Sequence, residues 1–256
     1  MASSAITATN LSHAYYDERQ QRSVVALSGV SFSVEEGEFV SIVGPSGCGK
    51  STLLRLLAGL ESVVMGGITV RGGRPGMVFQ DQSLFPWLTV EENVAYPLRV
   101  AGAAAAQWAE PVARLLELCG LADFRRAYPH QLSGGMKQRA AVARALAADR
   151  PVLLMDEPFG ALDEQTRLLL QQELLRVWER SGKTVVFITH SVEEALVLSD
   201  RVLVMSHRPG RMLQHIVVPF ERPRNVIELR RSPRFGELSY EIWRLLGLSH
   251  DNREAA

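Results

Sequence analysis

The segment GPSGCGKST at residues 44–52 constrains this chain more than any other feature of its sequence. It matches the pattern G-x-x-x-x-G-K-[ST], in which a glycine-rich loop surrounds phosphate groups. Glycines let the backbone curl so that successive N–H groups point at phosphate oxygens, and the following helix adds the positive end of its dipole. The segment lies between the apolar runs Phe39–Val43 and Leu53–Leu57, as a strand–loop–helix unit requires. It therefore predicts a site for a nucleoside triphosphate.

The residue types in this loop have distinct predicted roles. Lys50 brings a full positive charge to the β- and γ-phosphates, and the Ser51 hydroxyl is placed to ligate Mg²⁺. Cys48 stands at a position that mainly contributes backbone, which we favour over the alternative of a redox-sensitive thiol. The residues expected to bind ATP are Gly44, Pro45, Ser46, Gly47, Cys48, Gly49, Lys50, Ser51 and Thr52.

Short apolar runs alternate with helical patterns, which is typical of a mainly parallel sheet covered by helices. Near both ends the pattern alternates more and indicates antiparallel strands. Buried strands are expected at Phe39–Val43, Met77–Phe79, Val152–Met155, Thr184–Thr189 and Val202–Met205, and antiparallel strands at Ile6–Tyr15, Ala26–Val34 and Met212–Val218. The predicted fold class is α/β, with a mainly parallel sheet as core and an N-terminal antiparallel β subdomain.

Between Pro86 and Ala148 the strand pattern disappears, and this stretch is predicted to be an inserted helical subdomain. Pro111 predicts a helix start or a kink. The spacing of Leu, Val and Ala predicts helices at Val90–Val100, Gln107–Leu118 and Met136–Ala147, and an amphipathic helix at Phe235–Leu246 in the tail. The expected division is core and β subdomain over 1–85, helical subdomain over 86–148, second part of the core over 149–220, and tail over 221–256.

Two further motifs follow predicted buried strands. Asp156 and Glu157 end the run VLLMDE, and His190 follows TVVFIT. Because the carboxyl ends of parallel strands meet at one edge of a sheet, these side chains are expected beside the phosphate loop. Asp156 is predicted to hold Mg²⁺ and Glu157 to polarise the attacking water. His190 is predicted to contact the γ-phosphate, in preference to a purely structural role.

The composition limits the classes of protein to which this chain can belong. The chain has 256 residues, of which 46% are apolar, and 28 basic residues balance 28 acidic ones. Zero net charge argues against a sequence-independent nucleic-acid binder, so no nucleic-acid partner is expected. No run approaches the roughly 20 apolar residues of a membrane-spanning helix, and the N-terminus does not look like a signal peptide. Two cysteines make no disulfide framework, so a cytosolic protein is expected, with any membrane link through a partner.

The sequence LSGGM at Leu132–Met136 adds a second expected anion site. Ser133 is a predicted helix N-cap, and Gly134 and Gly135 expose backbone N–H groups at a positive helix end. Together with the motifs above, this segment resembles the signature of ATP-binding cassette (ABC) transporter subunits, with Met136 where glutamine is usual. The resemblance implies an ATPase whose signature contacts ATP held by the other subunit of a head-to-tail homodimer.

The resemblance assigns roles to further positions. Gln80 matches the glutamine that senses Mg²⁺ and the attacking water, so it joins Ser51 and Asp156 as a metal-site residue and Glu157 and His190 as a catalytic one. GALD at Gly160–Asp163 resembles the loop that crosses the dimer interface, which implicates Asp163. Tyr15 is the expected adenine-stacking residue, with Tyr16 as its competitor and ordinary strand packing as the alternative.

A finer resemblance links residues 80–98, 205–212 and the tail to the nitrate/sulfonate/taurine class of bacterial importers. It implies permease partners, an indirect link to a solute-binding protein, and a peripheral place on the cytoplasmic face of the membrane. Leu84, Phe85 and Trp87 are expected to form part of the groove for a permease helix; the alternative is that Phe85 and Trp87 are subdomain core. The solute itself is not read by any residue of such a subunit.

Two other classes remain as alternatives: a soluble cassette ATPase acting on nucleic acid or ribosomes, and an exporter ATPase. Fused cassettes, coiled-coil insertions or membrane segments would favour them, and this sequence shows none. The basic concentration in the tail is interpreted as a solvated surface. It consists of Arg222, Arg224, Arg230, Arg231 and Arg234.

Overall fold

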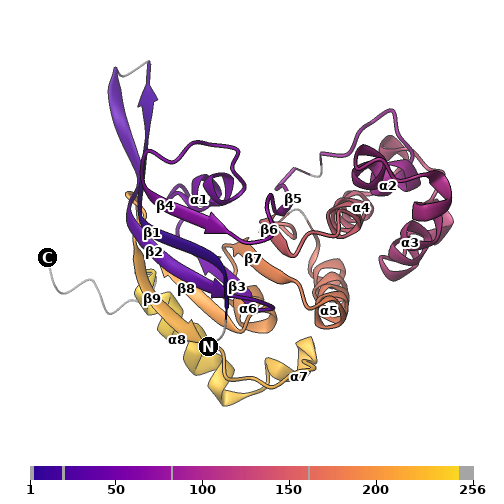
Figure 1. The fold of residues 1–256 in the computed structure, drawn as a ribbon. Helices are drawn as coiled ribbons and strands as arrows, with labels where there is room; N and C mark the ends of the chain where they lie inside the picture. The colour runs from indigo at the N-terminus through magenta and orange to yellow at the C-terminus, as the bar shows by residue number, and fades with distance from the viewer. Residues whose placement is uncertain (1–2, 19–20, 82, 161, 248–256) are drawn as a thin grey trace, which may run out of the picture.

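The computed structural model describes residues 3–18, 21–81, 83–160 and 162–247 (Figure 1). The predicted tail is therefore followed only to residue 247. Gln82, in the 80–98 segment matched to the importers, and Ala161, in the Gly160–Asp163 segment, lie outside the described residues.

A mostly parallel sheet forms the centre of the molecule, and within the described ranges it has the strand order β5-β6-β7-β3-β8-β9. Neighbouring strands run parallel except β9, which is antiparallel to β8. The two innermost strands, β3 and β7, are buried along their whole length, as their unbroken apolar runs predict. The bounds are β3 Phe39–Val43, β5 Gly76–Val78, β6 Val152–Asp156, β7 Thr184–Thr189, β8 Arg201–Met205 and β9 Met212–Val217.

A second, antiparallel sheet has the order β2-β1-β4. Its strands are β1 Ser4–Asp17, β2 Arg22–Glu35 and β4 Met65–Val70, and the β1–β2 pair extends as a long arm (Figure 1). Apolar side chains of this sheet pack with α1 (Lys50–Leu57) and one face of the central sheet into a shared core. The expected antiparallel β subdomain is present, and its strands are longer than the sequence pattern indicates.

Helices α2 (Val90–Val100), α3 (Ala105–Leu118) and α4 (Gly134–Ala147) form the helical subdomain beside the central sheet, with short 3₁₀ turns at Ala122–Phe124 and Pro129–Gln131 (Figure 1). The subdomain has a core of its own. The start of α2 is a capping box: Glu92 N donates to Thr89 Oγ1 at 3.3 Å, and Thr89 N donates to Glu92 Oε2 at 2.8 Å.

Pro111 does not begin a helix, so that alternative for Pro111 is wrong. Helix α3 starts at Ala105 and continues through the proline. A proline inside a helix removes one N–H from the ladder. Val112 and Leu116, both fully or almost fully buried, hold α3 against the subdomain core and compensate for that loss.

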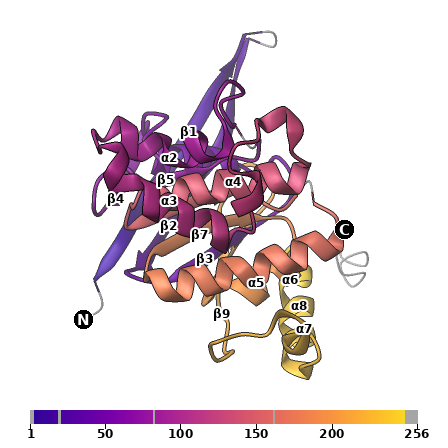
Figure 2. The same ribbon diagram turned by 90° about the vertical axis from the view of Figure 1, so that its right-hand side faces the viewer.

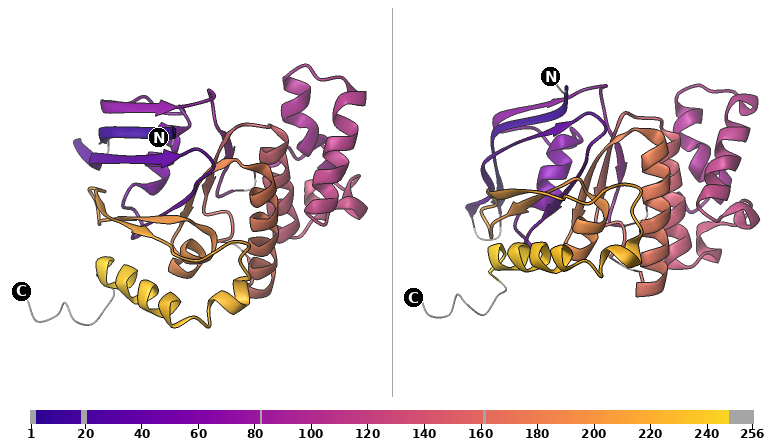
Figure 3. Two further views of the ribbon diagram at one scale, coloured as in Figure 1. Left: turned by 60° about the horizontal axis from the view of Figure 1, so that its bottom comes forward. Right: turned by 90° about the horizontal axis from the view of Figure 1, so that it is seen from below.

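The other face of the central sheet is covered by α5 (Glu164–Ser181), α6 (Val192–Leu198) and α8 (Pro233–Leu245), with the short α7 (Val226–Leu229) on the way to α8. Figures 2 and 3 show α5 lying alongside the helical subdomain and α8 along the bottom of the molecule. Helix α5 directly follows the Gly160–Asp163 loop, and α6 follows His190. These two helices therefore fix the segments that carry two predicted site residues.

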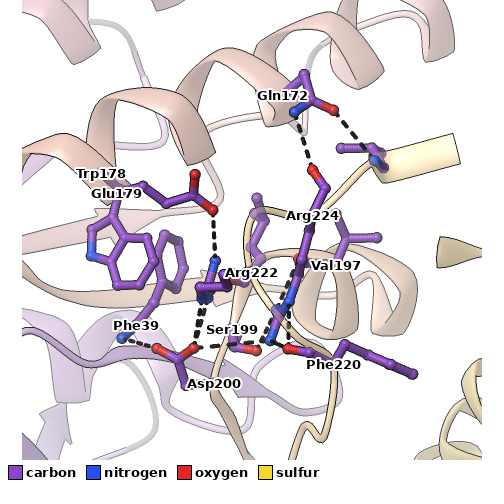
Figure 4. A network of polar contacts seen from close by, with 12 residues as sticks. Phe39, Gln172, Trp178, Glu179, Val197, Ser199, Asp200, Phe220, Arg222 and Arg224 are labelled. Atoms are coloured by element: carbon purple, nitrogen blue, oxygen red, sulfur yellow. Dashed lines mark hydrogen bonds and ion pairs between the residues drawn. The ribbon is translucent and has the colours of Figure 1, made fainter. Parts of the chain in front are cut away.

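The interpretation of the tail arginines as solvated is wrong for Arg222 and Arg224 (Figure 4). Arg224 is 4% exposed, and its guanidinium donates to the carbonyls of Val197, Ser199 and Phe220 at 2.7–3.3 Å. Burial lowers the pKa of Arg224 to about 10, which leaves the side chain charged at neutral pH.

Arg222 lies beside Arg224 in the same network. It donates to Asp200 Oδ1 at 2.8 Å and to Leu198 O at 2.7 Å, and its guanidinium carbon lies 4.1 Å from the Trp178 ring centroid. Both arginines thus fasten the tail to the end of α6. Arg231 and Arg234 form exposed ion pairs within their own segment, as a solvated surface would.

Among the residues that the structure describes, every helix is too short or too polar to cross a lipid bilayer.

Arg224→Ala should lower the free energy of unfolding by about 3 kcal/mol, because it removes the donor from two buried carbonyls and from the partly buried carbonyl of Phe220. Arg231→Ala is the matched control, since its ion pair is exposed and should contribute nothing measurable. Urea unfolding of both variants checks this. Equal stability of the two variants would show that the tail is not held by Arg224.

Candidate functional site

The phosphate loop joins β3 to α1, at the carboxyl end of the central sheet. Gly49 is the N-cap of α1 with a φ of 105°, a left-handed conformation that favours glycine. A Cβ at this position would lie 2.8 Å from Leu27 Cδ2 and 2.9 Å from Ala26 O. The sequence therefore requires glycine here for two reasons, backbone conformation and the close approach of β2.

Lys50 lies inside the loop and is only 6% exposed. Its ammonium donates to Gly44 O at 2.8 Å and to Pro45 O at 3.0 Å. The loop carbonyls thus hold the cation at the place where phosphate oxygens would compete for it. A buried lysine with only neutral acceptors is a strong binding site for an anion.

Cys48 turns its side chain into the core shared by the two sheets and is 1% exposed. Burial raises the pKa of this thiol, which disfavours the reactive thiolate. The structure therefore supports the backbone role and gives no support to a redox role.

Asp156 ends β6 next to the first turn of α1. Ser51 Oγ donates to Asp156 Oδ1 at 3.2 Å, although the two residues are far apart in sequence. Burial raises the pKa of Asp156, and the hydrogen bond from Ser51 opposes that shift. A hydroxyl and a buried carboxylate side by side are oxygen donors of the kind that Mg²⁺ prefers.

Glu157 brings together the predicted catalytic side chains. Gln80 Nε2 donates to Glu157 Oε2 at 3.4 Å, and His190 Nδ1 lies 3.5 Å from the same oxygen. Gln80 follows β5, Glu157 follows β6 and His190 follows β7, which are adjacent strands. The structure thus places all three residues at one edge of the sheet, as the sequence predicts.

The backbone of Glu157 is strained. Its φ is 44°, in the left-handed region, and its N–H donates to Ile188 O at 3.0 Å on the neighbouring strand. For a residue other than glycine this conformation costs about 1–2 kcal/mol. The strain turns the chain sharply after β6 and directs the carboxylate toward Gln80 and His190.

A cavity of about 430 Å³ opens over the phosphate loop. Tyr15 lines it, and the Tyr15 hydroxyl donates to Glu61 Oε2 at 2.6 Å and lies 3.1 Å from Thr52 Oγ1. Tyr16 is 64% exposed and is not among the lining residues, which favours Tyr15 as the aromatic wall. The other lining residues are Val24, Ala26, Ser46, Gly47, Gly49, Lys50, Ser51, Thr52, Gln80, Glu157 and Arg208.

Sequence reasoning missed Arg208 and Glu61. Arg208 reaches the cavity from the turn after β8, and no residue spacing connects that turn with the phosphate loop. Glu61 orients Tyr15 from the segment after α1. Glu61 belongs to no motif, and Arg208 lies in the 205–212 segment that was matched only to the importer class, so only the fold links these two residues to the nucleotide site.

The signature residues are not part of this cavity. Ser133 caps α4, with Met136 N donating to Ser133 Oγ at 3.3 Å, and Gly134 is exposed at the first turn. Gly135 packs against α5, where its Cβ position would lie 3.1 Å from Thr166 Cγ2. The helix end is formed as predicted, yet a single chain does not bring it to the phosphate loop.

Asp163, the predicted interface residue, is exposed and caps α5. Its Oδ1 accepts from Thr166 N at 3.0 Å, and this hydrogen bond lowers the pKa of the carboxyl. Asp163 lies outside the lining of the cavity. The predicted site residues therefore form two separate groups, one around the phosphate loop and one at the starts of α4 and α5.

The fold and the cluster around Glu157 define a phosphate-loop nucleoside triphosphatase. The family model described as "ABC transporter" matches residues 27–160, which is more than half of the chain. The chain belongs to the ABC transporter family. It is an ABC ATPase, so the resemblance stated from its motifs and the predicted fold class are confirmed.

The relatives and neighbours agree with this assignment. A nitrate import ATP-binding protein of Synechocystis sp. is 45% identical over 250 residues, covering 93% of each chain. A taurine import ATP-binding protein of Rhizobium johnstonii is 45% identical over 253 residues, covering 94% of this chain and 97% of that protein. A dimeric ATP-binding cassette in a post-hydrolysis state, bound to ADP and Pi, has a TM-score of 0.75 at 31% identity and covers 84% of this chain and 100% of that chain.

Asp156→Asn should not lower the stability of the nucleotide-free protein at neutral pH. A carboxyl whose pKa is raised by folding destabilises the folded state at pH values above its unfolded pKa, and asparagine removes this effect while still accepting from Ser51. Thermal unfolding at pH 7 checks the prediction. A melting temperature more than about 4 °C below that of the parent would contradict it, because it would show that the carboxylate stabilises the fold.

Proposed function

We propose that this chain is the ATP-hydrolysing subunit of an importer that takes up a small solute of the nitrate, sulfonate or taurine kind through a partner permease. The observation that carries the proposal is similarity along almost the whole chain to import ATP-binding proteins for nitrate and taurine. The cluster around Glu157 supplies the hydrolysis. These relatives favour an importer over an exporter or a cassette that acts on nucleic acid.

ATP occupies the cavity over the phosphate loop, with its adenine against Tyr15. Lys50 exchanges the carbonyls of Gly44 and Pro45 for phosphate oxygens. Glu157 accepts the proton of the attacking water, and His190, beside that carboxylate, contacts the γ-phosphate. Gln80 senses both the attacking water and the γ-phosphate, because its side chain already donates a hydrogen bond to Glu157.

Mg²⁺ fits the donor set beside the loop. Ser51 and Asp156 would hold it with hydroxyl and carboxylate oxygens, and the Gln80 amide oxygen is the third candidate. The ion neutralises phosphate charge during phosphoryl transfer. The raised pKa of Asp156 is consistent with this role, because a buried carboxylate without a cation is poorly stabilised.

The active unit is a homodimer in which two copies enclose two ATP molecules. Ser133, Gly134 and Gly135 form an anion site that a single chain leaves away from the loop, so a second chain is needed to supply it. The dimeric cassette with a TM-score of 0.75 supports this arrangement. Asp163 lies beside the signature on the same side and belongs to the dimer contact.

The permease contacts a groove between the central sheet and the helical subdomain. A groove of about 460 Å³ is lined there by Phe79, Phe85, Tyr96, Pro97 and Arg144, among others. Phe85 packs on Tyr96 with ring centroids 4.4 Å apart.

Trp87 stands beside this groove and is 70% exposed, which rules out a core role for it. Leu84 is partly buried and packs against the core of the helical subdomain. Docking on a permease would hold the chain at the cytoplasmic face of the membrane. A solute-binding protein would deliver the small solute to the permease from the other side.

Glu157→Gln should bind ATP and form a stable dimer while hydrolysing it at least about a hundredfold more slowly, because the amide cannot accept a proton from water. Size-exclusion chromatography with light scattering and a phosphate-release assay measure the two effects. Parent-like turnover would remove Glu157 from the catalytic role.

Trp87→Glu should abolish ATP-driven solute uptake in vesicles that contain the permease. An exposed aromatic side chain beside a groove is a common anchor of a protein interface, and a charge in its place opposes docking. ATP binding and the melting temperature of the isolated subunit should stay at parent values. Loss of ATP binding in the variant would show that Trp87 supports the nucleotide site, and parent-like uptake would exclude it from the docking surface.

A further inference from the structure

A line of polar side chains connects the loop before α5 with the strand end that carries His190. At one end, Arg167 Nη2 donates to the carbonyl of Leu162 at 2.8 Å. In the middle, Arg167 Nε lies 3.7 Å from Glu194 Oε1 on α6. At the other end, Glu194 Oε2 accepts from Thr189 Oγ1 at 2.5 Å. Thr189 is the residue immediately before His190.

The Thr189 hydroxyl spans His190. It donates to Glu194 and also accepts from Ser191 N at 3.0 Å, so it ties the residues on both sides of the histidine. The His190 side chain is largely exposed, and its Nδ1 lies 3.5 Å from Glu157 Oε2, so the backbone on either side does much to hold it. The direction of the imidazole is therefore set by the turn that Thr189 and Glu194 hold.

The segment at the start of α5 is also held by side-chain contacts. Arg167 bonds to Leu162 O and lies 3.5 Å from Glu164 Oε2, so it clamps the residues on both sides of Asp163. Asp163 is exposed between them. A protein surface that contacts Asp163 would thus displace the two groups that Arg167 holds.

The middle of the line is buried and incompletely bonded. Glu194 is 6% exposed, and burial raises the pKa of its carboxyl, against the effect of Thr189 and Arg167. Arg167 Nε approaches Glu194 Oε1 only to 3.7 Å and has no hydrogen-bond partner among the described residues, while the fully buried Gln171 lies beside the Glu194 carboxyl and lowers its pKa. A buried donor is rarely left unpaired in one fixed arrangement, and a spare donor beside a buried carboxylate allows a second arrangement of the same groups.

We propose that Arg167 and Glu194 are positioning residues that couple the segment Leu162–Glu164 to His190, so that a second copy docked at Asp163 sets the imidazole for hydrolysis. The inference rests on the homodimer of the proposed function. Docking shifts Leu162, Arg167 follows its carbonyl, Glu194 follows the guanidinium, and Thr189 turns His190 relative to Glu157. ATP hydrolysis is thereby confined to the closed dimer.

The first experiment is a double-mutant cycle on steady-state ATP hydrolysis. Arg167→Ala should lower kcat about tenfold, with the KM for ATP within about twofold of the parent. In a His190→Ala background the same substitution should have no further effect, because the relay acts only through that imidazole. A merely structural arginine would lower the rate by the same factor in both backgrounds.

Conservative variants and a matched control keep the test independent of folding. Thr189→Ser keeps the hydroxyl and should retain parent kcat, whereas Thr189→Val should lose about as much as Arg167→Ala. Arg176→Ala removes another arginine of α5, which forms an exposed ion pair with Glu173, and should leave kcat unchanged. Parent kcat in Thr189→Val, or equal factors in both backgrounds of the cycle, would overturn the relay.

The dimer assay separates this inference from the function on which it rests. Glu157→Gln with Arg167→Ala should dimerise with ATP as Glu157→Gln does alone. Loss of the dimer only when Arg167 is replaced would place Arg167 in the contact and overturn its positioning role. Failure of Glu157→Gln itself to dimerise would overturn the homodimer, and the relay with it.

Discussion

The parallel pairing of β3, β6 and β7 is the constraint on which the site depends. Val43 is opposite Thr189, and Asp156 is opposite Ile188, so three strands end at nearly the same level. These strands are buried on both faces, and a shift of one residue would turn every side chain to the other face. The register therefore fixes where the phosphate loop, Glu157 and His190 emerge.

Sequence reasoning succeeded where function depends on neighbours in the chain. The phosphate loop, the Asp156–Glu157 pair and the end of β7 each combine a buried strand with a polar residue at its end, and one rule about sheet edges brings them together. The burial of a side chain by residues distant from it in the sequence was not predictable in this way. Arg224 is buried because carbonyls of Val197, Ser199 and Phe220 converge on it, and no local pattern distinguishes it from the exposed Arg231.

Helix α5 shows a second limit. Its sequence EQTRLLLQQELLRVWERS mixes charged residues with a leucine-rich stripe, and the sequence prediction assigned no helix there. Asp163 is the N-cap of this helix, but the resemblance of GALD to an interface loop points only to a role in dimer contact. The relay through Arg167 was missed for the same reason, since it depends on which face of α5 meets α6.

The site holds several groups in unfavourable states. Glu157 is strained, Asp156 and Glu194 are buried carboxylates with raised pKa values, and Arg167 Nε has no hydrogen-bond partner among the described residues. Such features persist where function requires them rather than where stability does. In this account they define the resting half of a composite site, which nucleotide and a second chain complete.

Mixing two inactive variants tests the composite site most directly. Lys50→Ala disables the loop, and Gly134→Asp adds a repulsive charge to the signature, where a Cβ meets nothing within 4 Å. Each variant alone should be inactive. An equal mixture should recover about a quarter of parent ATPase activity, since half of the dimers are mixed and each has one intact site. No recovery, or full activity of Gly134→Asp alone, would contradict a site shared between two chains.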